Sequence, residues 1–380
     1  MKNAEPFEVH VSDETLSDLH DRLERSRWPM PEESDWQHGT SADYLRGIVS
    51  YWRDGYDWRA QEQQINRFSQ WRTTTGDRLH FLMEPGSGSN PAPLLICHGW
   101  PGSITEFLDV VEPLAHPERF GGSEADAFTV VAPHLPGYGF SDAPSQHLTH
   151  RDIAARLHTL MSDVVGFDSY FVQGGDVGSG VVTWLAHDHP ESVPAVHINT
   201  VSFAPEVAAD QLAEEEVAWL ADYEKWRHGE SAYKEIQGTR PLSLAYALTD
   251  SPLGLAAWVL DKFKAWSTPT EDGRPPFSRD RLLTNLMMHW LPGPYAPMWT
   301  YGAARNHRSL RLPDGTPFST PTGLFLCPYD IRLPPPDAWI RRIHNMVHRT
   351  DAKSGGHFAA MEIPDEFVTD VREFFRPFRT

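Results

Sequence analysis

The stretch that decides the fold of this chain is VQGGDVGS, residues 172–179. An apolar run, residues 170–172, leads into a glycine-rich turn, and a helix is predicted from residue 178 to residue 187. A strand that turns this sharply into a helix presents the central side chain of the turn above a sheet. That central residue is Asp176. A carboxylate is also favoured at any helix N-terminus by the helix dipole, so the motif needs support from the rest of the chain.

The carboxylate at the centre of the turn narrows the chemistry. If Asp176 attacked an ester carbonyl, the product would be an unstable anhydride, so it is a poor substitute for a serine nucleophile. It can instead attack a saturated carbon that carries a good leaving group, forming an alkyl ester on the enzyme. The motif therefore favours epoxide opening or carbon–halogen cleavage.

The composition indicates a globular protein and argues against several partners. The chain has 380 residues, of which 40% are hydrophobic and 14 are Trp, enough for a sizeable core. Its 33 basic and 52 acidic residues give a net charge of −19, which argues against binding nucleic acid or an anionic membrane. No apolar leader and no run of 18 apolar residues occurs, so a cytoplasmic protein is expected.

The cysteines and histidines show no pattern of a metal or disulfide framework. Cys97 and Cys327 both lie in apolar runs and are predicted to be core thiols of a reducing compartment. The 19 His are scattered without metal-ligand spacing. Neither a metal nor another cofactor is expected.

The first quarter of the chain, residues 1–75, is predicted to be a helical N-terminal arm. Its helices are expected over residues 12–27, from Ser41 to a stop at Gly55, and over residues 58–71. Such an arm cannot bury its apolar faces alone. We therefore expect it to wrap the core or a lid.

The remaining chain alternates strands and helices, with one interruption. Residues 76–202 and 303–380 show the alternation, which implies a mostly parallel sheet. Ser103 and Glu106 are predicted to form a capping box at the start of one of these helices. Residues 203–302 are mainly helical and rich in Trp, and we interpret them as an inserted lid. The predicted class is α/β, with the α/β-hydrolase fold, a helical lid and a helical N-terminal arm.

Three residues follow the chain order of an α/β-hydrolase triad. They are the nucleophile Asp176, the acid Asp330 just past a predicted strand, and His357 in a glycine-flanked loop before the last helix. Taken alone, Asp330 could cap the next segment and His357 could be an ordinary polar loop residue. Their combination with the turn at residue 176 favours catalysis, with His357 activating water for hydrolysis of the ester.

The chemistry also needs hydrogen-bond donors at two places, one for the oxyanion and one for the leaving ring oxygen. The backbone N–H groups of Trp100 and Val177 are the candidates for an oxyanion hole. The ring oxygen of an epoxide needs a donor when it leaves, and a phenol can supply one without a resting charge. Tyr233 and Tyr301 of the lid are the candidates, and Tyr246 competes with them, as does Tyr295.

The chain resembles epoxide hydrolases of the microsomal-type branch, in a soluble bacterial-like form. The motifs that carry this resemblance are HGWPGS at residues 98–103, GGDVGS at 174–179, IQGTRP at 236–241 and TDSPLG at 249–254, together with the N-terminal arm. The resemblance covers nearly the whole chain. It implies epoxide hydrolysis without a cofactor, and it places the two ring-opening tyrosines of the family on Tyr233 and Tyr301.

The chain departs from the family pattern at three points. Val177 follows the nucleophile where the family usually has Trp, which leaves the backbone donor and weakly favours a bulky substrate. The acid is Asp330 where some members use Glu. Membrane-bound members carry an N-terminal anchor that this sequence lacks.

Two alternatives stay open beside epoxide hydrolysis. A haloalkane dehalogenase shares the fold and the Asp nucleophile, but Val177 removes a common halide donor. A catalytically silent binding protein of this fold usually loses a triad member, and here all three are present. The expected partners are a small-molecule epoxide and water, without nucleic acid or membrane, and a homodimer is left open.

Overall fold

The computed structural model describes residues 1–307, 309–312, 315–331 and 333–379. These residues form a nine-stranded sheet in the order β1-β2-β3-β5-β4-β6-β7-β8-β9. Its pairs from β5 through β4 to β9 are parallel, and β1, β2 and β3 pair in antiparallel fashion at one edge. The predicted mostly parallel sheet is therefore confirmed. The strands are β1 (Ala4–Pro6), β2 (Gln70–Thr73), β3 (His80–Glu84), β4 (Ala92–Cys97), β5 (Phe128–Pro133), β6 (Phe171–Gly174), β7 (Val196–Ile198), β8 (Phe318–Leu326) and β9 (His344–Asp351).

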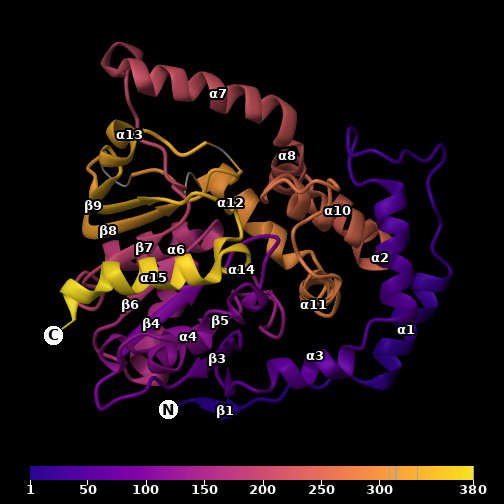
Figure 1. Ribbon diagram of the computed structural model, residues 1–380, viewed down its shortest axis with the longest axis horizontal. Coiled ribbons are helices and arrows are strands. Elements are labelled where there is room, and N and C mark those ends of the chain that lie inside the picture. Colours follow the sequence, from indigo (N-terminus) through magenta and orange to yellow (C-terminus); the bar gives the residue numbers. More distant parts are fainter. Residues whose placement is uncertain (308, 313–314, 332, 380) are drawn as a thin grey trace.

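Helices cover both faces of the sheet, because its central strands are apolar on both sides (Figure 1). In β4, Leu95 and Cys97 face the cluster that contains helices α5 and α6, whereas Leu94 and Ile96 face the cluster of α4 and α15. The flanking helices are α4 (Val111–Ala115), α5 (His150–Thr159), α6 (Val177–Asp188), α13 (Asp337–Arg341), α14 (Ala359–Glu362) and α15 (Pro364–Phe375). Helix α5 continues as one π-helical segment, Leu160–Val165.

The predicted lid is a set of helices inserted between β7 and β8. Figure 1 shows most of them beside the sheet, with the long helix α7 standing apart at the top. The predicted helix over residues 279–290 has the observed bounds, and those near residues 213–226 and 255–266 differ by a few residues. The lid helices are α7 (Glu214–Glu230), α8 (Ala232–Thr239), α9 (Pro241–Asp250), α10 (Pro252–Ala265), α11 (Arg279–Trp290) and α12 (Trp299–His307). None of the helices in the described part of the chain has the length and apolarity needed to span a bilayer.

The N-terminal arm packs on the lid and also extends the sheet. Its helices α1 (Asp13–Glu24), α2 (Ala42–Asp54) and α3 (Trp58–Ile65) contact α10 and α11 and share one apolar core with them. The predicted stop at Gly55 and the cap at Ser41 are confirmed.

Part of the arm was predicted wrongly. The helix expected over 58–71 ends at Ile65, and residues 70–73 form β2 between β1 and β3. The apolar spacing there is helical, but pairing with two distant strands outweighs local propensity.

Two further local predictions were wrong. The capped helix expected at Ser103 is a single 3-10 turn, Ile104–Phe107, and Glu106 does not close a capping box. Instead the Glu106 carboxyl packs against Gly102, where an added Cβ would lie 1.5 Å from it. Strand β9 was not predicted, because this edge strand buries only some of its residues and lacks an apolar run.

A buried carboxylate fixes the last helix to the sheet. Asp370 of α15 accepts hydrogen bonds from His197 Nε2 at 2.8 Å, His348 Nε2 at 2.9 Å and Thr350 Oγ1 at 2.5 Å. Burial opposes its charge, but these donors hold the pKa of Asp370 down at about 2. The ionised form is therefore stabilised by folding.

We expect Asp370→Asn to lower the free energy of unfolding at pH 7 by about 3 kcal/mol, because an amide cannot accept all three bonds. The pKa in the folded state lies below the ordinary value of 3.8, so the contribution is complete above that pH and is lost as the pH falls through about 2. Urea unfolding at pH 7 measures it. Glu366→Gln, an exposed change on the same helix, is the control and should stay within about 0.5 kcal/mol of the parent. A loss for Asp370→Asn no larger than that of the control would contradict the prediction.

Candidate active site

Asp176 stands at the turn between β6 and α6 in a strained backbone conformation. Its φ is 48° and its ψ is −122°, which side chains other than Gly rarely adopt. The turn is tight because α6 lies directly against β4. A Cβ added to Gly178 would lie 2.2 Å from the Cys97 carbonyl oxygen. The strained geometry projects the Asp176 carboxylate beyond the carboxyl ends of the parallel strands, where the sequence placed it.

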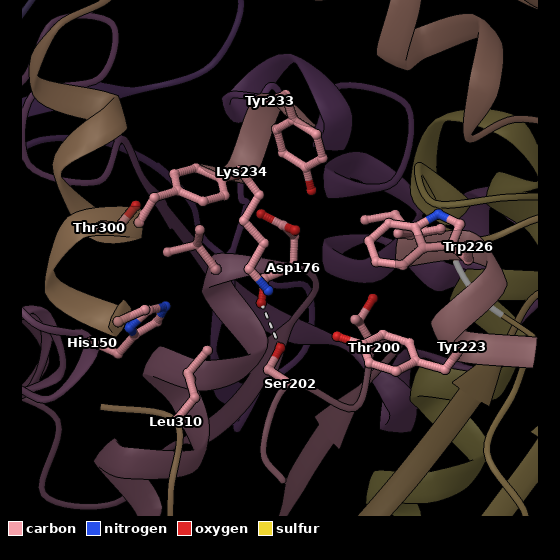
Figure 2. A pocket seen from close by; sticks show the side chains of 14 residues that line it. His150, Asp176, Thr200, Ser202, Tyr223, Trp226, Tyr233, Lys234, Thr300 and Leu310 are labelled. Atoms are coloured by element: carbon pink, nitrogen blue, oxygen red, sulfur yellow. Dashed lines mark hydrogen bonds between the residues drawn. The ribbon is translucent and has the colours of Figure 1, made fainter. Parts of the chain in front are cut away.

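Two hydroxyl groups hold the strained turn in place. Ser179 Oγ donates to the Asp176 carbonyl oxygen at 2.9 Å, and Ser202 Oγ donates to the same oxygen at 3.0 Å, a bond drawn in Figure 2. Ser202 comes from the segment that follows β7. The turn at Asp176, called the elbow below, is therefore held by one residue of α6 and by one residue of the segment after β7.

The structure brings the three predicted triad residues together. His357 Nδ1 lies 2.6 Å from Asp330 Oδ1, and His357 Nε2 lies 3.5 Å from Asp176 Oδ2. Asp330 follows β8 and accepts a bond from the Ile331 N–H at 2.6 Å. His357 is anchored through its own N–H, which donates to the Trp266 carbonyl at 2.7 Å. The imidazole thus lies between two carboxylates from different strand ends.

The charges of the triad stabilise one another. Burial alone would lower the pKa of His357, but the charge of Asp330 and the bonds to both carboxylates raise it to about 10. Burial disfavours the charged form of Asp176, but His357 and backbone N–H groups keep the pKa of that carboxyl below its usual 3.8. At neutral pH the resting site therefore holds an ionised nucleophile beside a protonated imidazole.

Both predicted oxyanion donors contact the nucleophile. The Trp100 N–H donates to Asp176 Oδ1 at 2.9 Å, and the Val177 N–H also bonds this carboxylate. This approach requires a glycine at position 99, because an added Cβ would lie 2.4 Å from both Asp176 Cβ and Oδ1. The HGWP turn and the elbow are therefore fitted against each other through their backbones.

The two predicted tyrosines face the nucleophile from the lid. Tyr233 of α8 stacks on the Trp100 ring at 5.3 Å, and Tyr301 of α12 meets the same ring edge-on at 5.8 Å. Figure 2 shows the Tyr233 hydroxyl directed toward the Asp176 carboxylate. Burial and the nearby Tyr233 and Asp176 hold the pKa of Tyr301 well above 10, so this phenol stays protonated.

The competing tyrosines lie elsewhere. Tyr246 is 71% exposed on α9, and Tyr295 packs edge-on against Trp299 at 5.2 Å. Neither is among the residues that line the pocket above Asp176, whereas Tyr233 and Tyr301 are.

Sequence reasoning missed three polar residues of this site. Glu106, predicted to be a helix cap, bonds the Gly99 N–H, and burial raises its pKa to about 8 despite the nearby His357. His150 begins α5 and lines the pocket, and burial lowers its pKa to about 4. Lys234 lines the same pocket beside Tyr233. The position of Lys234 next to a predicted catalytic tyrosine was the one signal that could have identified it.

The described part of the chain contains no group of three or more His, Cys, Asp or Glu side chains arranged to hold a metal ion. Cys97 and Cys327 are buried and free, and burial raises the pKa of both thiols.

Fold and site together define an α/β-hydrolase whose turn between β6 and α6 carries a carboxylate. Residues 4–107 match the family described as epoxide hydrolase N terminus, and residues 92–242 match the alpha/beta hydrolase fold. The chain is 34% identical to epoxide hydrolase 1 of Sus scrofa, covering 97% of this chain and 88% of that protein. It is 32% identical to juvenile hormone epoxide hydrolase 2 of Ctenocephalides felis, covering 96% and 84%.

Solved structures of other epoxide hydrolases are also similar to this chain. The silkworm Bombyx mori juvenile hormone epoxide hydrolase has a TM-score of 0.87 at 26% identity, covering 99% of this chain and 95% of that one. The Aspergillus niger epoxide hydrolase has a TM-score of 0.84 at 29% identity, covering 98% and 96%. The chain belongs to the epoxide hydrolase family and is a hydrolase.

The position of Asp330 predicts a pH effect on the step in which an ester at Asp176 is hydrolysed. His357 can accept a proton from water only when it is neutral, so the rate rises with pH through the pKa of His357. In the ester Asp176 has no charge, and Asp330 remains to raise that pKa. We therefore expect Asp330→Asn to move the rising limb of the pH–rate profile at least one unit toward lower pH. We also expect it to lower the maximal rate on the order of 100-fold or more, because His357 loses the carboxylate that orients its ring.

Single-turnover rates of ester hydrolysis from pH 5 to pH 10 measure this effect. Asp330→Glu is the matched control, since it keeps the charge and should keep the position of the limb. An unshifted limb in Asp330→Asn would show that Asp330 does not set the pKa of His357.

Proposed function

We propose that this protein converts an epoxide and water into a vicinal diol through an alkyl ester on Asp176. In the first step Asp176 Oδ2 attacks a ring carbon, the carbon–oxygen bond of the ring breaks, and the ring oxygen takes a proton from a lid tyrosine. In the second step water attacks the ester carbonyl, and His357 accepts the proton. The carbonyl then re-forms as the bond between the acyl carbon and the substrate oxygen breaks. The second proton of the water passes to that leaving oxygen, and the proton on His357 returns to the tyrosinate, so the diol is released, Asp176 is a carboxylate again and the tyrosine is restored.

One observation carries this assignment: the two oxygens of Asp176 have different partners. Oδ1 accepts from the Trp100 N–H at 2.9 Å, whereas Oδ2 lies 3.5 Å from His357 Nε2. If Oδ2 forms the ester bond, Oδ1 becomes the carbonyl oxygen that is already in the oxyanion hole. A developing negative charge on Oδ1 then needs no reorganisation, and one such donor is worth about 3–4 kcal/mol in other hydrolases.

Esterification also converts His357 from a charged group into a base. The pKa of His357 is raised by two carboxylates in the resting site. Alkylation removes the charge of Asp176, and the imidazole then binds its proton less tightly. The loss of the Asp176 charge on esterification therefore supports the order of the two steps.

The tyrosines fit the leaving oxygen. Tyr233 and Tyr301 lie on the lid side of the pocket whose other wall holds Asp176, with ring centroids 5.8 Å apart. Both phenols can reach one oxygen between them. We also propose that residues 203–302 act as the lid that supplies them, with residues 1–75 bracing it. The side chain of Val177 has no N–H to hold a halide, which supports epoxides over haloalkanes as substrates.

Some relatives are named juvenile hormone epoxide hydrolases. For this chain we propose a small-molecule epoxide, a cytoplasmic location and no nucleic acid or membrane partner, as the charge of −19 supports. A homodimer stays a proposal that light scattering would decide.

We expect His357→Gln to form the ester and then to stall, because ring opening does not need a base whereas hydrolysis does. Intact mass after mixing with styrene oxide should rise by the mass of one epoxide. The same variant with Asp176→Asn added should show no gain, which separates ester formation at the elbow from labelling elsewhere. If His357→Gln alone never shows the adduct with an epoxide that the parent enzyme hydrolyses, the two-step mechanism is refuted.

We expect the double change Tyr233→Phe and Tyr301→Phe to slow ring opening by at least about 100-fold, since the alkoxide then leaves without a proton donor. Tyr246→Phe is the control, because this exposed tyrosine lies outside the pocket. Pre-steady-state quenching of ester formation is the measurement. An unchanged rate of ester formation in the double variant would remove both tyrosines from the mechanism.

A further inference from the structure

The substrate pocket contains a cation that the mechanism above does not use. Lys234 directly follows Tyr233 on α8 and lines the pocket together with Asp176 (Figure 2). Figure 2 shows its side chain extending from the helix toward the region of Asp176 and Ser202. The residue as a whole is exposed, so part of it is in contact with solvent.

Lys234 is the only Lys or Arg among the fourteen described residues that line the pocket. The other charged residue is the nucleophile Asp176. His150 is neutral at physiological pH, since burial lowers its pKa to about 4. Lys234 contributes to that lowering, so its charge reaches deep enough to act on a buried imidazole.

The nucleophile does not account for this lysine. The groups that chiefly hold the pKa of Asp176 down are His357 and the N–H groups of Trp100 and Val177. A neutral epoxide has no charged group for an ammonium to pair with before the ring opens. An anionic substrate, in contrast, must approach a carboxylate in a protein of net charge −19, and it needs a local cation to offset that repulsion.

We propose that Lys234 is a specificity-determining residue that binds an anionic group of the substrate, and that the preferred substrates are epoxides carrying a carboxylate. This inference rests on the proposed function. A single ammonium supplies one positive charge, which matches the charge of a carboxylate better than the charge of about −1.5 to −2 on a phosphate monoester. The rest of the substrate would lie against the aromatic wall of Tyr223 and Trp226, whose rings stack 5.7 Å apart on α7.

The test compares two epoxides of the same shape. 3-Phenylglycidate carries the carboxylate, and 3-phenylglycidamide replaces it with a neutral amide. We expect the parent enzyme to favour the glycidate by about tenfold in kcat/KM, a difference typical of a hydrogen bond to a charged group. We expect Lys234→Met to bring the ratio close to one, mainly through KM, and Lys234→Arg to keep most of it.

The matched control is Lys225→Met, on the neighbouring lid helix α7. Its ammonium pairs with Asp222 at 2.7 Å, its side chain is 78% exposed, and it is not part of the pocket lining. It should leave the ratio as in the parent. Added salt should reduce the preference of the parent and have little effect on Lys234→Met, since screening acts only where the charge remains.

The outcomes separate the two proposals. Equal efficiency on glycidate and glycidamide in the parent, or an unchanged preference in Lys234→Met, would overturn the role of Lys234 and leave epoxide hydrolysis standing. A parent enzyme that hydrolyses neither compound, nor styrene oxide, would overturn the proposed function and this inference with it.

Discussion

The hydrogen bond from the Trp100 N–H to Asp176 Oδ1 is the contact on which the rest of the site depends. It joins the turn after β4 to the elbow after β6, and both turns must approach each other without side chains between them. The glycines at positions 99 and 178 permit that approach, since a Cβ at either would collide with the opposing turn. The 2.9 Å bond also determines which oxygen of the carboxylate is free to react, because Oδ1 is already occupied. A strained backbone at residue 176 is the cost of this arrangement, and two hydroxyl groups stabilise it.

Aromatic side chains connect the lid helices to the core, and the arm helices pack on the lid. Trp100 extends from the core turn and stacks on Tyr233, while Trp266 contacts Trp100, Tyr233 and His357. Contacts between these rings set the position of Tyr233, the proposed proton donor, relative to Asp176. Helices α10 and α11 of the lid are in turn packed by the arm helices α1, α2 and α3. The arm therefore packs on two helices of the lid that carries both tyrosines, and its strands β1 and β2 join it to the sheet edge.

The residues of the candidate site could be chosen from the sequence because its parts are local. The elbow, the HGWP turn and the order Asp176, Asp330, His357 each follow from short stretches of sequence, and the structure brings them within hydrogen-bonding reach. Predictions failed where pairing with strands far away in the sequence determined the local structure. Strand β2 had helical spacing but joined β1 and β3, and β9 is a polar edge strand. Glu106 had the position of a helix cap, but its carboxyl turned inward to the backbone of Gly99.

The sequence by itself determined the alternation of strands and helices and the residue types from which the candidate nucleophile and triad were predicted, because each depends on residue type and on short-range spacing. The tertiary structure alone decided which oxygen of Asp176 is held and which tyrosines face it. It also placed Lys234 and His150 in the lining of the same pocket. These features depend on side chains from segments far apart in the chain. Their distances and shared burial are set by packing, and no local pattern records them.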